Sequence, residues 1–215
     1  MGNTLKVEYS SFIFNYREDT TDWGIIQQSC GGMYTKFFDV EPGELWLDFG
    51  AHIGSFSIYA ASKGAEVIAF EPVPETYKLL VSNIKNNGFE KRITAVNKAV
   101  SNEAGKAQIF VNTTNFGASS IIENDPTKTI FDIDVIDAKT LSPPRNFCVK
   151  VDTEGCEYPI IKSLNIEKVT KLVFEYHWWL RLPVRGEECR GLQKIMEENF
   201  PHIEECPDNM HYAWR

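Results

Sequence analysis

Short apolar runs alternate with amphipathic stretches along most of this chain. The runs have the length and composition of β-strands, and the stretches between them repeat apolar residues at helical spacing. The pattern predicts strands at 45–49, 66–70, 93–96, 106–111, 130–136, 147–151, 171–176, 203–205 and 210–214. It predicts helices at 55–63, 74–87, 157–164 and 187–199.

The alternation of strands and helices is typical of a parallel sheet covered on both faces. We therefore expect an α/β fold with a doubly wound, mostly parallel Rossmann-like sheet, and the short final strands predict an antiparallel C-terminal edge. The 215 residues suit a single domain. We divide it into an N-terminal extension and cap at 1–43 and a Rossmann-like core at 44–215. In the extension, residues 7–16 predict one strand or an extended arm, and 23–28 a short helix.

The first strand of the core runs into a glycine turn. Asp48 lies near the strand end, Gly50 and Gly54 follow, and a helix then begins. Such glycines allow a ligand to approach the backbone closely, and the free N–H groups of the helix start point toward it. The spacing differs from the dinucleotide and phosphate-loop motifs. Asp48 suits a cationic ligand such as S-adenosylmethionine, although an ordinary strand–turn–helix would carry the same residues.

The second core strand ends in an acid, Glu71, followed by Pro72 and Pro74. An acid roughly 20 residues beyond a glycine turn, at the end of the next strand, can bind both ribose hydroxyls of a nucleoside. A solvated acid at a strand end is the plainer interpretation. The glycine turn and Glu71 together favour a pocket for an adenosine-bearing cofactor more strongly than either does alone.

More acids follow the strand at 147–151, namely Asp152, Glu154 and Glu157. The carboxyl ends of parallel strands meet at one edge of a sheet, so we expect these acids near the glycine turn. They are either catalytic groups or caps of the next helix.

The strand at 171–176 leads into a second polar group. Glu175 and His177 alternate with an aromatic residue, so both point to one side. Histidine is the usual general base near neutral pH. The adjacent Trp178 and Trp179 offer flat faces suited to sugar rings, and equally to a core. The loop at 115–120 is small and polar; it is either part of an acceptor site or a plain surface loop.

Composition narrows the possible partners and location. The formal net charge is −8, and an acidic body repels phosphate backbones, so we expect no nucleic acid partner. The five cysteines form no Cys-x-x-Cys pair, which favours free thiols in a reducing compartment. No apolar run is long enough to span a membrane, and the N-terminus has no apolar signal region. We expect a cytoplasmic protein, or a domain of a longer protein with other glycan-modifying domains.

The motifs together resemble the FkbM-type S-adenosylmethionine-dependent methyltransferases, from about Tyr34 to His177. The matching pieces are Asp48-x-Gly50-Ala51-x-x-Gly54, Ala69-Phe70-Glu71-Pro72-x-Pro74, Lys98-Ala99, Ser119-Ser120, Lys150-x-Asp152-x-Glu154-Gly155-x-Glu157 and Glu175-x-His177. The first piece is shared by class I methyltransferases generally, whereas Asp-x-Glu-Gly-x-Glu is more specific to this family.

The resemblance implies a Rossmann-like enzyme with S-adenosyl-L-methionine as cofactor. Asp48, Gly50 and Gly54 would line its methionine end, Glu71 would hold the ribose, and Lys98 with Ala99 would flank the adenine. The predicted cofactor-binding residues are Asp48, Gly50, Ala51, His52, Gly54, Glu71, Pro72, Lys98, Ala99 and Asp152. His52 stands where the family often has Asn. The first 33 residues and the tail after His177 match no motif, and we expect them to shape the acceptor site.

The resemblance also implies methylation of a sugar hydroxyl on a glycan or glycosylated product. A hydroxyl needs a base or a metal near it. We expect Asp152 or His177 to take the proton, with Glu154 and Glu175 orienting the base or the acceptor. The same four residues offer ligands that suit Mg²⁺ or Mn²⁺, so a divalent metal is possible. The alternatives are methylation of a non-sugar small molecule, a NAD-dependent Rossmann oxidoreductase, and a non-catalytic module that binds cofactor or glycan.

Overall fold

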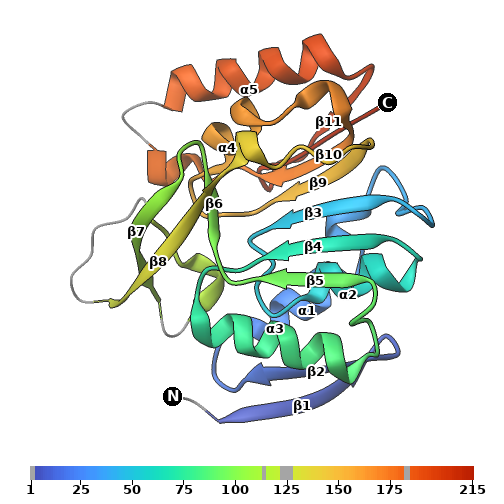
Figure 1. Ribbon diagram of the computed structural model, residues 1–215, viewed down its shortest axis with the longest axis vertical. Helices are drawn as coiled ribbons and strands as arrows, with labels where there is room; N and C mark the ends of the chain where they lie inside the picture. The colour runs from blue at the N-terminus through green and yellow to red at the C-terminus, as the bar shows by residue number, and fades with distance from the viewer. Residues whose placement is uncertain (1–2, 113–114, 122–127, 182–184) are drawn as a thin grey trace.

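The central feature of the protein is a seven-stranded sheet in the order β11–β12–β10–β9–β3–β4–β5. The computed structural model describes residues 3–112, 115–121, 128–181 and 185–215. The parallel strands are β3 (Leu45–Phe49), β4 (Glu66–Phe70), β5 (Ile93–Val96), β9 (Phe147–Val151) and β10 (Val169–Glu175). The antiparallel edge is β12 (Met210–Trp214) on β10 and β11 (His202–Glu205) on β12. The predicted α/β sheet with an antiparallel C-terminal edge is confirmed (Figure 1).

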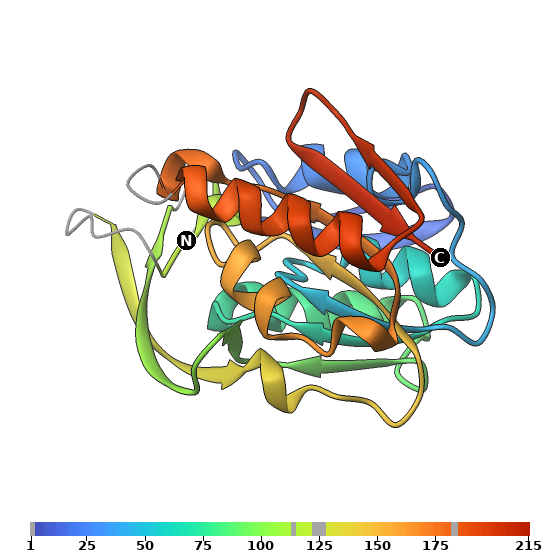
Figure 2. The same cartoon turned by 90° about the horizontal axis from the view of Figure 1, so that it is seen from above.

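Helices cover both faces of this sheet. One face packs on α1 (Asp22–Cys30), α2 (Ser55–Ser62) and α3 (Pro74–Asn86), and the other on α4 (Glu157–Ser163) and α5 (Arg185–Asn199). Figure 2 shows α4 and α5 lying together on their face. Strand β3 contributes side chains to the cores on both faces of the sheet. Trp46 joins the core under α2, while Leu47 and Phe49 join the core under α4. Among the described residues, no helix is both long and apolar enough to cross a membrane.

A small second sheet stands across the carboxyl ends of the central strands (Figure 1). It has three strands in the order β6–β8–β7. The strands are β6 (Ala99–Ser101), β7 (Gly105–Val111) and β8 (Thr129–Asp137). Strands β7 and β8 match the predicted ranges closely, but β6 was not predicted, since three residues are too few to show a period. The short 3₁₀ turn η2 (Phe116–Ala118) follows β7.

The N-terminal extension begins with a hairpin where the sequence predicts one strand or arm. Strand β1 (Thr4–Tyr9) pairs antiparallel with β2 (Phe12–Arg17). The two turn residues, Ser10 and Ser11, have φ of 52° and 70°. Two-residue hairpin turns need such positive φ values and usually take Asn or Gly there. A pair of serines carries no such signal, so the turn could not be read from the sequence.

Two asparagines at the C-terminal end of α3, Asn83 within the helix and Asn87 directly after it, attach the free side of β2 to the core. Asn87 accepts from the Ile13 N–H at 2.9 Å and donates to the Ile13 carbonyl at 2.8 Å. One turn earlier, Asn83 accepts from the Asn15 N–H at 2.6 Å and donates to the Asn15 carbonyl at 3.0 Å. Asn83 also donates to the Ile53 carbonyl at 2.9 Å, so it ties the hairpin to the glycine turn. The amides thus supply the pairing that a neighbouring strand would supply.

We predict that Asn83→Ala lowers the free energy of unfolding by about 2–4 kcal/mol, since it leaves buried backbone groups without partners. Urea unfolding measures the change. Lys78→Ala, on an exposed position of the same helix, is the matched control and should change stability by less than about 0.5 kcal/mol. Equal stability of the two variants would contradict the anchoring role of Asn83.

Candidate active site

A cavity of about 390 Å³ lies at the carboxyl edge of the central sheet. This size falls in the range of small-molecule sites. The predicted site residues that line it are Gly50, Ala51, His52, Glu71, Pro72, Lys98, Ala99, Asp152, Glu154 and Glu175. They come from the ends of β3, β4, β5, β9 and β10, so the topology brings together residues that are far apart in the sequence.

Asp48 and Gly54 do not belong to this lining. Asp48 is fully buried beneath the turn, where it accepts from Ser57 Oγ at 2.6 Å and lies 3.2 Å from Lys150 Nζ. Its charge therefore faces a lysine of the protein. At Gly54, φ is +93° and an added Cβ would lie 2.6 Å from Leu80 Cδ1, so this glycine allows α3 to pack against the turn.

Lys150 joins the ends of β3 and β9 under the cavity. Its ammonium donates to the Gly50 carbonyl at 2.7 Å and lies 3.8 Å from Asp152 Oδ2. Burial favours the neutral amine, but Asp48 and Asp152 outweigh it and raise the pKa of Lys150. Gly50 has φ of +78°, and an added Cβ would lie 1.7 Å from the Asp152 carbonyl oxygen. Only glycine lets the two strand ends meet this closely.

Glu71 offers fixed acceptors to the cavity. It is 6% exposed, and its two carboxylate oxygens accept from the backbone N–H groups of His52 at 3.0 Å and Val73 at 2.8 Å. Burial raises the pKa of Glu71, and His52 and the Val73 N–H oppose that shift. Each carboxylate oxygen can accept more than one hydrogen bond, so both can also receive hydroxyl donors from a ligand.

The other end of the cavity holds a cluster of acids around His177. The imidazole is buried, with Nδ1 at 3.2 Å from Glu157 Oε1 and Nε2 at 3.3 Å from Glu154 Oε1. Glu175 and Asp152 oxygens lie 3.6 Å and 3.9 Å from Nε2. Burial favours neutral histidine, yet the bonds to Glu154 and Glu157 raise the pKa of His177 to about 12. This shift favours the imidazolium form of His177 at neutral pH.

The three acids of this cluster that line the cavity, Asp152, Glu154 and Glu175, differ in proton affinity. Burial favours neutral Asp152, but Lys150 and His177 lower the pKa of Asp152 below its ordinary value, and Tyr34 Oη donates to it at 2.7 Å. Burial raises the pKa of Glu154. Burial and the charge of Asp152 raise the pKa of Glu175 to about 7. Glu175 thus has the proton affinity expected of a general base at neutral pH.

Helix α1 belongs to the first 33 residues, which we expected to shape an acceptor site, and it supplies a wall of this cavity. Gly24, Ile25, Gln28 and Ser29 line it, as do Thr21 just before the helix and Tyr34 just beyond it. From the other side come Asn115, Phe116, Gly117 and Ser119, in the loop at 115–120. Apart from Ser119, these residues match no motif, since a wall needs only size and shape. Lys150 is a further site residue, and its signal in the sequence was a charge inside an apolar strand.

Comparison with known families assigns the fold and its class of chemistry. A family model described as the methyltransferase FkbM domain matches residues 48–205. The chain belongs to this family. The resemblance drawn from the motifs is thereby confirmed, and with it a methyltransferase that uses S-adenosylmethionine.

Two curated relatives of this FkbM chain are RNA methyltransferases. The tRNA (guanine(37)-N(1))-methyltransferase of Aedes aegypti is 32% identical over 97 residues, which are 45% of this chain and 15% of that protein. The 23S rRNA (uracil(1939)-C(5))-methyltransferase of Shewanella amazonensis is 34% identical over 67 residues, 31% of this chain and 15% of that protein. The chain thus spans about a seventh of the length of these relatives, since each matched segment covers 15% of the relative.

A solved structure supports the fold alone. The precorrin 8W decarboxylase of Methanobacterium thermoautotrophicum superposes with a TM-score of 0.50 at 11% identity, covering 88% of this chain and 90% of that chain.

The predicted exclusion of nucleic acid as a partner is wrong. Relatives of this FkbM domain are RNA methyltransferases by name, so a domain of this kind occurs in proteins that act on RNA. The inference failed because net charge is an average over the whole chain. It says nothing of local fields or of the other parts of a longer protein.

The lining fits the cofactor that the FkbM family implies. The Glu71 carboxylate can accept from ribose hydroxyls, and the side chains of Val100, Ile109 and Phe116 form an apolar wall suited to a flat base. At the far end, the Asp152 carboxylate would face the sulfonium and ammonium of S-adenosylmethionine. The donor set therefore matches a nucleoside with a cationic tail.

We predict that Glu175→Gln stabilises the FkbM protein at pH 8 by roughly 1–3 kcal/mol, because glutamine mimics the neutral acid. The pKa of about 7 in the fold exceeds the ordinary 4.5. Native stability therefore falls as pH rises from 4.5 to 7, and the gain of the variant should vanish near pH 4.5. Urea unfolding at both pH values measures it. Glu204→Gln, at an exposed site, is the control; a pH-independent effect of Glu175→Gln would refute the raised pKa.

Proposed function

We propose that this protein is an O-methyltransferase that transfers a methyl group from S-adenosylmethionine to a sugar hydroxyl of a glycan or glycosylated product. The observation that carries the proposal is the position of Glu175, a carboxyl that lines the cavity 3.6 Å from His177 Nε2, where burial raises its pKa to about 7. A hydroxyl acceptor must lose a proton during transfer, and a base with this pKa is suited to receive it.

The proposed roles of the lining residues follow from the charges around the cavity. The bound cofactor supplies an activated methyl group on a sulfonium. Glu71 would orient the ribose, and the ionised Asp152 would face the cationic end of the cofactor. Tyr34 donates to Asp152 and fixes its carboxylate. Much of the rate enhancement would come from this alignment of donor and acceptor.

Glu175 is a better candidate for the base than either residue favoured by the sequence. His177 already carries its proton, and Asp152 is too weak a base because its pKa is lowered. His177 and Glu154 then act as positioning groups, since the imidazolium contacts Glu154, Glu175 and Asp152 at once. The retained charge of His177 keeps these acids close together in spite of their repulsion.

The sugar acceptor rests on a weaker feature, Trp179. Its ring is 42% exposed and meets His177 edge to face at 5.0 Å between centroids. An exposed indole beside catalytic acids is suited to stack on the apolar face of a sugar ring. RNA is the second candidate acceptor, favoured by the names of the two curated relatives.

The experiment has two stages. Calorimetric titration with S-adenosylhomocysteine and, separately, NAD tests the cofactor; binding of NAD alone would favour an oxidoreductase. Transfer of label from S-adenosylmethionine is then measured with glycans, non-sugar small molecules and RNA as acceptors. Labelled glycan supports the proposal. Labelled RNA or small molecule would overturn the sugar acceptor, and cofactor binding without transfer to any acceptor would indicate a binding module.

We predict that kcat/KM for the acceptor rises with pH through about 7, because Glu175 must be ionised to accept a proton. Glu175→Gln should lower kcat by roughly 100-fold or more and remove this pH dependence. Affinity for S-adenosylhomocysteine, measured by calorimetry, should stay within about threefold. An unchanged pH profile in the variant would exclude Glu175 as the base.

A divalent cation is the alternative means of binding these acids together. Atoms of Asp152, Glu175 and His177 lie within 4.8 Å of one another, close enough to share an ion. A metal would have to displace the Nε2 proton of His177, which contacts Glu154, Glu175 and Asp152. We therefore predict that turnover persists after chelation with EDTA and does not rise with added Mn²⁺ or Mg²⁺. Loss of turnover on chelation, restored by one of these ions, would assign the cluster to a metal.

A further inference from the structure

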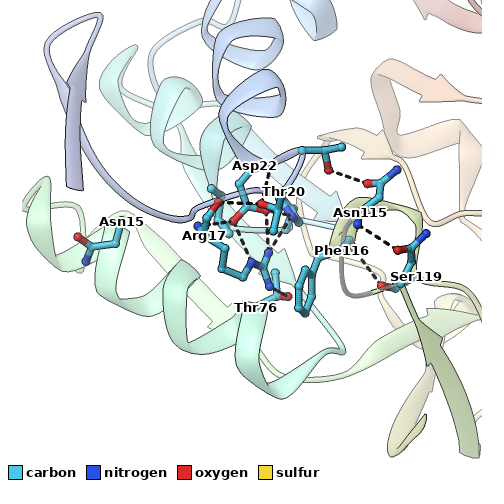
Figure 3. A network of polar contacts seen from close by, with 12 residues as sticks. Asn15, Arg17, Thr20, Asp22, Thr76, Asn115, Phe116 and Ser119 are labelled. Atoms are coloured by element: carbon cyan, nitrogen blue, oxygen red, sulfur yellow. Dashed lines mark hydrogen bonds and ion pairs between the residues drawn. The ribbon is translucent and has the colours of Figure 1, made fainter. Parts of the chain in front are cut away.

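A buried arginine in the N-terminal hairpin begins a chain of contacts that reaches the cavity (Figure 3). Arg17, at the end of β2, is 7% exposed. Its Nε and Nη2 donate to the two carboxylate oxygens of Asp22 at 2.9 Å and 2.8 Å. Nη1 donates to Thr76 Oγ1 at 2.9 Å, at the start of α3. The side chain therefore joins the hairpin, α1 and α3.

The next link is His52, in the glycine turn. Asp22 Oδ1 lies 3.1 Å from His52 Nε2, and Arg17 Nη2 lies 3.2 Å from the same atom. His52 has φ of +53°, a conformation that side-chain-bearing residues rarely adopt unless their surroundings hold them. In this conformation the backbone N–H of His52 donates to Glu71 Oε2 at 3.0 Å. Arg17 and Asp22 are thus connected to the acid that faces the ribose.

A second branch reaches the opposite wall. The guanidinium carbon of Arg17 lies 3.6 Å from the centre of the Phe116 ring, within stacking distance. Phe116 lines the cavity. Beside it, Thr21 Oγ1 donates to Asn115 Oδ1 at 2.7 Å, so α1 and the loop at 115–120 are held against each other (Figure 3).

We propose that Arg17 and Asp22 are positioning residues for the cofactor. They hold His52 in the backbone conformation that fixes Glu71, and Arg17 holds Phe116 against the apolar end of the cavity. The segment before the family-matched region at 48–205 therefore sets cofactor affinity. This inference rests on the proposed function, because the ligand concerned is S-adenosylmethionine.

Attachment of the hairpin does not require this ion pair. Asn83 and Asn87 already bind the backbone of β2. A buried ion pair is in general weak support for stability, since desolvation offsets much of the attraction. The contact of Asp22 with His52 instead holds the conformation of the glycine turn. Loss of this contact should therefore weaken ligand binding.

The test compares Asp22→Asn and Arg17→Lys with the wild-type protein by calorimetric titration with S-adenosylhomocysteine. We expect Kd to rise roughly 10- to 100-fold for Asp22→Asn, as for a lost charge-assisted hydrogen bond, and less for Arg17→Lys. KM for S-adenosylmethionine should rise while kcat at saturation stays within about twofold. Arg145→Gln, which breaks the more exposed ion pair with Glu66, is the matched control and should leave Kd unchanged.

A third variant, His52→Gly, tests the route of the coupling. Glycine adopts positive φ without the imidazole, so the variant loses the link to Asp22 and keeps the turn. We expect its Kd to rise, and the double variant with Asp22→Asn to bind no more weakly than the weaker single variant. Thermal melting establishes that each variant is folded. If Asp22→Asn does not fold, the Kd values of the folded Arg17→Lys and His52→Gly variants test the proposal.

The outcomes separate the two proposals. A wild-type protein that fails to bind S-adenosylhomocysteine refutes the proposed function itself. A wild-type protein that binds, with folded Arg17→Lys and His52→Gly variants of unchanged Kd, refutes the positioning role alone. Additive effects of Asp22→Asn and His52→Gly would refute the route through His52.

Discussion

The site depends on one buried ammonium group, that of Lys150. It is bonded to the Gly50 carbonyl and faces the carboxylates of Asp48 and Asp152. Asp48 is fully buried, and in the part of the chain that the structure describes Lys150 is the cation paired with it. The close approach of the β3 and β9 ends places Asp152 at the cavity. Because the lysine is part of a central strand, its position at the floor of the site is set by the sheet itself.

Negative charge exceeds positive charge in the cluster above this floor. Lys150 and His177 face the carboxyl groups of Asp48, Asp152, Glu154, Glu157 and Glu175. Asp152 faces both Lys150 and His177, and its pKa is lowered. Of these two cations, Glu175 contacts His177 alone, and burial together with the charge of Asp152 outweighs that contact and raises the pKa of Glu175 to about 7. Two carboxyl groups of one cavity therefore acquire different chemistry from their neighbours alone.

The sequence predicted the sheet well because its strands are separated by long regular elements. It also placed Glu71 and Asp152 at the cavity, since the carboxyl ends of all parallel strands lie at the same edge of the sheet. Asp48 was harder, because strand alternation cannot tell whether a buried acid meets a ligand or a lysine from the neighbouring strand. The charge state of His177 was hidden for a related reason, since its proton affinity depends on Glu154 and Glu157. Helix α1 was read as part of an acceptor site, and no local pattern could reveal that it lines the same cavity as Glu71.

The asparagine pair on α3 has a consequence for association between chains. A two-stranded hairpin has two open edges, each able to recruit a strand from another molecule. Asn83 and Asn87 occupy backbone groups of Asn15 and Ile13, so the β2 edge is closed at these positions to a foreign strand. The β1 edge remains open, and it carries the exposed charges of Lys6 and Glu8, which discourage such pairing. Side chains at the C-terminal end of α3 thus take the place that a strand of another molecule would need on β2.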